Sequence, residues 1–139
     1  MKIYLYYIGK PRDPHANLIA EDFLARAARF VPCEIREIRP GRADLWARHP
    51  TARKILLDPR GRGMDSKAFT TFVDRAATES RDLVFVVGGA DGLPAGWAER
   101  ADLLLSLSAM TFPHELARAM LAEQIYRALA TLRGHPYPR

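Results

Sequence analysis

The 139-residue sequence contains one cysteine, four lysines and no long apolar run. Cys33 alone can form neither a disulfide within the chain nor a cysteine metal cluster, which favours a reducing compartment, the cytoplasm. The four histidines lack the spacing of metal ligands, so we predict no metal. No stretch approaches the roughly 20 apolar residues that cross a bilayer. The opening MKIYLYYIGKPRDP is typical of a strand and a turn rather than a signal peptide, and we predict no membrane partner.

The composition is that of a globular protein with a basic character. Hydrophobic residues make up 48% of the chain and charged residues 27%, which is enough apolar material for one core in one domain spanning residues 1–139. Arginine supplies 17 of the 21 basic side chains, and the stretch from Arg36 to Arg62 carries an excess equal to the whole net charge of +5. Because the guanidinium fork binds phosphate, this stretch hints at a nucleic-acid partner. A solvated basic surface explains the same charge equally well.

Apolar spacing predicts an alternation of strands and helices. Strands are expected at 2–8, 33–38, 54–57, 82–87 and 102–108, and helices at 15–30, from 65 or 66 onward, at 95–100 and at 113–133. The first helix has an apolar stripe of Ile19, Phe23, Ala27 and Phe30. The run DLVFVV is typical of a strand buried on both faces. We therefore predict an α/β fold with a mostly parallel sheet and flanking helices.

Three of these strands end in unusual loops, and parallel sheets bind ligands at the carboxyl ends of their strands. LLDPRGRG has the composition of a turn. FVVGGADGLP carries glycines at 88, 89 and 92, which fit neither the dinucleotide fingerprint nor a phosphate loop, and a tight turn explains them as well as a ligand does. If the three loops are neighbours, they form one pocket.

The third loop, LSLSAMTFPH, is the most informative. Ser108 or Thr111 can cap the following helix, and Pro113 fits its first turn. Capping does not explain Ala109 and Met110, which suit the lining of an adenine or sulfur ligand.

The charged residues of the last helix are explained by the ordinary structure of a surface helix. His114 is more often a first-turn helix residue than a catalyst, and Arg118, Glu123 and Arg127 can form surface pairs. The residues alone support a nucleotide- or small-molecule-dependent enzyme that acts on nucleic acid.

The segments LLDPRG, FVVGGADGL, LSLSAMTFPHELAR, AEQIYRA and a terminal HPY occur in this order along the chain. In this order and spacing they closely resemble the RlmH family, the YbeA-like branch of the knotted SPOUT methyltransferases. The resemblance implies a trefoil knot at the C-terminal end, a homodimer, and S-adenosylmethionine bound in the knot. The implied cofactor contacts are Leu57, Gly88, Leu107, Ser108, Ala109, Met110, Thr111 and Phe112.

The implied reaction is methylation of N3 of a pseudouridine in helix 69 of 23S rRNA, on the assembled 70S ribosome. Methyl transfer needs an in-line approach, and the imide N3 attacks better once its proton has left. Within the resemblance, His114 and Arg118 are candidates to position or polarise the base, and Tyr137 and Arg139 are candidates in the tail.

The chain departs from the family at its end. The family usually ends in Tyr-His and a basic residue, in a tail that reaches the partner's cofactor pocket, whereas Tyr137 is followed here by Pro138 and Arg139. We expect either that Tyr137 and Arg139 suffice or that His135 takes the missing role. The segment before Ile55 is also shorter than is usual in the family, so an rRNA contact there is expected to be trimmed.

Three other functions compete with this one. The first is a non-catalytic ribosome-binding factor on the same fold. The second is a SPOUT enzyme with another RNA target, such as tRNA. A generic nucleotide-binding enzyme is disfavoured by the missing phosphate motifs.

Overall fold

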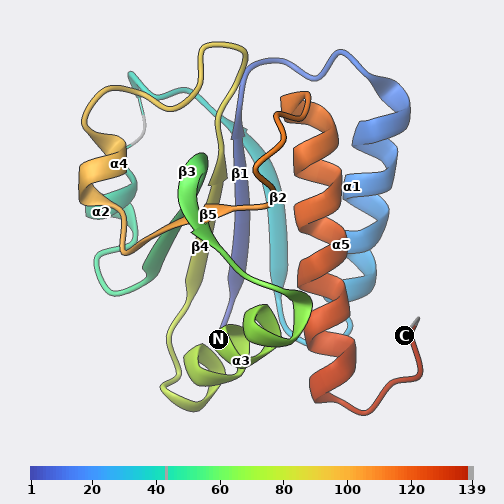
Figure 1. Ribbon diagram of the computed structural model, residues 1–139. Helices are drawn as coiled ribbons and strands as arrows, with labels where there is room; N and C mark the ends of the chain where they lie inside the picture. Colours follow the sequence, from blue (N-terminus) through green and yellow to red (C-terminus); the bar gives the residue numbers. More distant parts are fainter. Residues whose placement is uncertain (43, 138–139) are drawn as a thin grey trace.

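A five-stranded parallel sheet with helices on both faces forms the protein, as the computed structural model shows for residues 1–42 and 44–137 (Figure 1). The elements in chain order are β1 (Ile3–Ile8), α1 (Pro14–Ala27), β2 (Cys33–Ile38), α2 (Leu45–Arg48), β3 (Arg53–Gly63), α3 (Ser66–Thr78), β4 (Leu83–Val87), α4 (Trp97–Arg100), β5 (Leu103–Ser106) and α5 (His114–Leu132). The strand order is β2-β1-β4-β3-β5. The predicted α/β class with a parallel sheet is confirmed.

The sheet is covered unequally on its two faces. Helices α1, α3 and α5 cover the larger core on one face, and the short α2 and α4 cover the other around Leu45 and Trp97 (Figure 1). All five residues of β4 are buried, as the continuous apolar run predicts for a central strand with helices on both sides. Within the described residues, no helix is long and apolar enough to span a membrane.

Helix α1 buries a different stripe from the predicted one. Asp13 caps its start by accepting from the backbone N–H groups of His15 and Ala16, at 3.0 and 3.1 Å. The buried face is built mainly from small residues and Leu24, and Ile19 is 48% exposed. The stripe prediction is wrong for Ile19, because the alanine-rich face lets α1 lie close against α5 and turns the larger side chain outward.

Strand β3 runs further than predicted. The expected turn in LLDPRGRG is an irregular continuation of the strand, in which Leu57 and Arg62 both pair with Leu105 of β5. The residues between them bulge away and return to the same partner strand. Gly61 makes this return feasible, since a Cβ there would lie 2.6 Å from the carbonyl carbon of Leu104. Helix α2 was not predicted, as its four residues are too short for a periodic signal. The trefoil knot stays a prediction.

Candidate active site

The carboxyl ends of β3, β4 and β5 meet around one pocket of about 170 Å³. It is lined by Leu57, Asp58, Pro59, Val87, Gly88, Gly89, Gly92, Leu93, Leu105, Leu107, Ser108, Met110, Phe112, His114 and Ala117. Every one of the three unusual loops contributes to this lining, so the loops are neighbours, which is the condition under which the sequence predicts one pocket. A larger cavity of about 460 Å³ shares Leu105 and Leu107 but otherwise lies against α3 and α5, away from the β4 loop.

The loop after β4 is a tight turn with its backbone at the pocket. Gly92 has φ +77° and donates its N–H to the carbonyl of Gly89 at 2.9 Å. A Cβ on Gly88 would lie 2.7 Å from the carbonyl carbon of Gly92, so no side chain fits there without moving the turn. The tight-turn interpretation is therefore correct, and the same turn presents bare backbone to the pocket.

The loop after β5 is held by its own serines. The Ser106 hydroxyl donates to the carbonyl of Ser108 at 2.9 Å, and the Ser108 hydroxyl accepts the N–H of Met110 at 3.0 Å. Helix α5 instead begins after Pro113, which provides no side-chain cap. The capping prediction is therefore wrong for both Ser108 and Thr111, because the Ser108 hydroxyl is used inside the loop.

Most of the predicted cofactor residues lie on this pocket. Those that line it are Leu57, Gly88, Leu107, Ser108, Met110 and Phe112, and the candidate catalyst His114 lies on the same wall. Ala109 and Thr111 belong to the same loop but are exposed and do not line the pocket. Sequence reasoning did not single out Asp58, Leu93 and Ala117, although the first two fall inside the loops it identified.

Arg118 is fully buried rather than on the surface. Its guanidinium lies 3.6 Å from the centroid of the Tyr7 ring and donates from Nη1 to Oδ1 of Asn17. Burial lowers the pKa of this guanidinium. The predicted surface pair is therefore wrong for Arg118, whereas Arg127 and Glu123 form theirs at 2.7 Å. A role of Arg118 toward the substrate stays a prediction.

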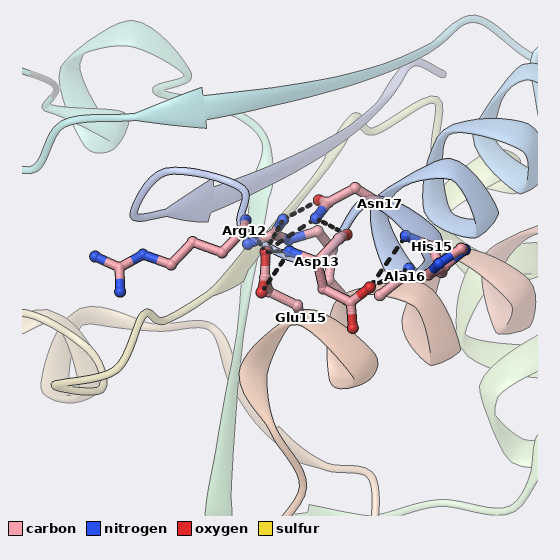
Figure 2. Close-up of polar contacts among 7 residues, drawn as sticks. Arg12, Asp13, His15, Ala16, Asn17 and Glu115 are labelled. Carbon is pink, nitrogen blue, oxygen red and sulfur yellow. Dashed lines mark hydrogen bonds and ion pairs between the residues drawn. The ribbon is translucent and has the colours of Figure 1, made fainter.

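Glu115 joins the start of α5 to the start of α1 (Figure 2). Its carboxylate accepts from the backbone N–H of Arg12 at 2.6 Å, from that of Asp13 at 3.2 Å and from Nδ2 of Asn17 at 2.9 Å. The backbone donor of Arg12 and then the Asn17 amide hold the pKa of Glu115 at about 2, despite the opposing effect of desolvation. Partners about 100 residues away leave no local sequence signal, which is why this contact was not predicted.

The C-terminal tail lies against its own chain, away from the pocket. The Tyr137 hydroxyl donates to Glu123 at 2.9 Å, and its ring meets that of Tyr126 edge-on at 4.6 Å. His135 is exposed, with its ring 6.0 Å from that of Phe30. Arg139, the other predicted tail residue, lies outside the described residues, as does Pro138. The tail roles stay predictions.

The basic stretch from Arg36 to Arg62 is partly engaged in contacts within the chain. Several of its charges are already engaged: Arg53 pairs with Glu79 at 3.0 Å, Arg60 with Asp58 at 2.9 Å, and Lys54 is buried against the carbonyl of His49. The net charge of this stretch is as the sequence indicates, but fewer of its side chains are available to bind nucleic acid than the count of arginines implies.

Comparisons with known proteins give the family. A model described as "Predicted SPOUT methyltransferase" matches residues 1–138. The ribosomal RNA large subunit methyltransferase H of Solibacter usitatus is 72% identical over 139 residues, with both chains covered completely. The chain belongs to the RlmH family of SPOUT methyltransferases. An RlmH relative from Thermus thermophilus is 39% identical over 139 residues, covering 100% of this chain and 99% of that one.

Solved structures agree on the SPOUT fold of this RlmH-family chain. A probable methyltransferase from Bordetella pertussis is 13% identical, covers 91% of this chain and 93% of its own, and has a TM-score of 0.63. The SpoU methyltransferase AviRb of Streptomyces viridochromogenes, solved with AdoMet, is 12% identical, with a TM-score of 0.54 and coverage of 94% and 61%. At these identities the likeness shows the fold alone.

Proposed function

We propose that this chain, as a single SPOUT domain of residues 1–139, transfers methyl from S-adenosylmethionine to N3 of a pseudouridine in helix 69 of 23S rRNA, on the assembled 70S ribosome in the cytoplasm. The observation that carries the proposal is the pocket at the ends of β3, β4 and β5, where the RlmH motif residues converge. The names of the full-length relatives support rRNA of the large subunit as the substrate class.

The pocket suits S-adenosylmethionine in its chemistry. Leu57, Leu107 and Phe112 give it an apolar lining, and the β4 turn adds a backbone surface without side chains. Such a combination accommodates a flat base while offering backbone groups for hydrogen bonds. We assign the cofactor to Leu57, Gly88, Leu107, Ser108, Ala109, Met110, Thr111 and Phe112, of which Ala109 and Thr111 would contact it only if the exposed loop closes. The bound cofactor supplies an electrophilic methyl group.

The chain's own residues then have to orient the base and remove a proton. A bond forms from N3 to the methyl carbon, the bond from that carbon to sulfur breaks, and the N3 proton leaves. His114 is on the pocket wall, and an imidazole nitrogen can accept such a proton. Arg118 lies four residues further along α5 and is buried against Tyr7 and Asn17, so we assign it a positioning role for the start of α5. Tyr137 and Arg139 are proposed to act from the tail of a partner subunit.

A homodimer is part of the proposal. Four large apolar side chains on α1 and α5 are exposed by 42% to 64%: Leu18, Ile19, Leu116 and Met120. These helices lie side by side on the same face of the sheet (Figure 1). Exposed apolar side chains concentrated on one helix layer favour a protein interface over a solvated surface.

Methyl transfer to purified RNAs tests the proposal. Labelled S-adenosylmethionine is incubated with the protein and 70S ribosomes, isolated subunits or tRNA. We expect label in the large-subunit RNA of 70S ribosomes. Label in tRNA alone would show another target of the same fold, and saturable ribosome binding without cofactor affinity would show a non-catalytic factor.

A further inference from the structure

The loop between β1 and α1, residues 9–13, borders the active-site pocket. On one side, the pocket residue Gly89 lies so close to the end of β1 that a Cβ on it would be 2.8 Å from the carbonyl oxygen of Ile8. On the other side, Glu115 accepts the backbone N–H of Arg12 at 2.6 Å, and its neighbour His114 lines the pocket. The loop therefore begins and ends beside residues that line the pocket, and the hydrogen bond from Arg12 to Glu115 holds it there.

The loop is stiff. Its backbone is fixed at Arg12 and Asp13 by the Glu115 carboxylate, and Asn17 ties the carbonyl of Asp13 through Nδ2 at 2.7 Å. Pro11 and Pro14 restrict the chain on either side of Arg12, because the proline ring fixes φ. A side chain on such a loop is presented at a defined place with little backbone entropy to lose on binding.

The Arg12 side chain itself is not engaged. Figure 2 shows it extending away from the contacts that its backbone makes. The residue is exposed, and its guanidinium forms no hydrogen bond or ion pair within residues 1–42 and 44–137. The two carboxylates that adjoin its backbone are used elsewhere, since Asp13 caps α1 and Glu115 binds backbone N–H groups. An arginine held by its backbone but with an unused guanidinium fork is suited to bind an external anion.

We propose that Arg12 binds a backbone phosphate of the substrate RNA at the rim of the pocket and so positions the target nucleotide. This inference rests on the proposed function, which supplies RNA as the substrate. Lys10, exposed on the same loop, adds a second positive charge. The loop thus takes the role that the basic stretch from Arg36 to Arg62 only partly fills, since several of those charges are paired within the chain.

The test compares Arg12→Gln, Arg12→Lys and a matched control, Arg29→Gln. Arg29 is an exposed arginine just after the far end of α1 and has no side-chain partner among the described residues. Methyl transfer to 70S ribosomes gives kcat and KM, and ribosome affinity is measured over a range of salt concentrations. Calorimetry measures cofactor affinity, and the melting temperature checks that each variant is folded. The hydrogen bond from residue 12 to Glu115 comes from the backbone, so the substitutions at Arg12 keep it.

Arg12→Gln is expected to raise KM about 10-fold, because the variant loses one charge-assisted contact to the RNA. Its kcat and its cofactor affinity should be unchanged. The slope of log affinity against log salt should fall by about 0.7 to 1, the value for one phosphate. Arg12→Lys should keep the wild-type slope and stay within about 3-fold in KM, because it keeps the charge. Arg29→Gln should match the wild type.

Two results would overturn the phosphate-binding role of Arg12 but not the proposed function. One is an unchanged KM and salt slope in Arg12→Gln, and the other is an equal rise of KM in Arg12→Lys and Arg12→Gln. Both would leave wild-type methyl transfer intact, so the proposed function would stand. A wild-type protein that methylates no ribosomal RNA would instead overturn the proposed function and this inference with it.

Discussion

Replacing Glu115 by glutamine tests how the active-site helix is attached to the rest of the fold. The substitution keeps the shape of the side chain but removes the charge that accepts hydrogen bonds from Arg12, Asp13 and Asn17. It also turns an amide NH₂ toward backbone donors. The pKa of Glu115 is held at about 2, against an ordinary value of 4.5. Linkage puts an upper limit of about 3 kcal/mol on the stabilisation at neutral pH, and screening at a partly solvated site reduces it to about 2 kcal/mol.

The stabilisation by Glu115 depends on pH in a defined direction. Because the folded-state pKa lies below the unfolded-state value, the stabilisation is fully present above about pH 4.5 and is lost as the pH falls toward about 2. Urea unfolding at fixed protein concentration should show Glu115→Gln less stable by about 2 kcal/mol at pH 7, with a melting temperature roughly 6–10 °C lower. The difference from the wild type should shrink between pH 4.5 and pH 2.5.

The control for this experiment is Asp22→Asn, which removes an exposed carboxylate 3.5 Å from Arg26 on the same helix. An exposed i,i+4 pair of this kind contributes less than about 0.5 kcal/mol, so the free energy of unfolding of this variant should be close to that of the wild type. A loss below about 0.5 kcal/mol for Glu115→Gln, or a difference that stays constant with pH, would show that the Glu115 carboxylate does not stabilise the fold in this way.

Other consequences are equally direct. Gly88→Ala should lower S-adenosylmethionine affinity at least about 10-fold by calorimetry, because its Cβ would meet the Gly92 backbone at 2.7 Å and move the pocket turn; an unchanged affinity would contradict the pocket assignment. Leu18→Glu should shift sedimentation from dimer to monomer without unfolding the chain, since Leu18 is 64% exposed in the isolated chain; a persistent dimer would place the interface elsewhere. Burial raises the pKa of the Cys33 thiol to about 12, so iodoacetamide at pH 8 should label the native protein far more slowly than the urea-unfolded one; equal rates would contradict this.

Much of the fold follows from patterns short enough to be read locally. The apolar run of β4 predicts a central buried strand. Helix α3 starts where the sequence predicts, and Asp65 caps it by accepting the N–H of Ala68 at 2.7 Å. The order of strands and helices predicts the parallel sheet, and its topology brings the three loops together. The pocket could therefore be located from the sequence once the loops were recognised.

What could not be predicted depends on partners distant in the chain. Arg118 looks like a surface charge on an amphipathic helix, and its burial depends on Tyr7 and Asn17, which sequence spacing cannot place beside it. The return of β3 to Leu105 likewise depends on a close approach at Gly61, where the local sequence is typical of an ordinary turn. Ile19 fits a helical apolar stripe, yet the smaller alanines decide which face packs.

The central claim is the identity of the methylated atom, and mapping it is the most direct test. The protein and labelled S-adenosylmethionine are incubated with 70S ribosomes that carry or lack the pseudouridines of helix 69, and the labelled nucleotide is identified by mass spectrometry. We expect label at N3 of one pseudouridine in helix 69, and much less on ribosomes that lack the modification. Label at another nucleotide, or equal label on both kinds of ribosome, would contradict it.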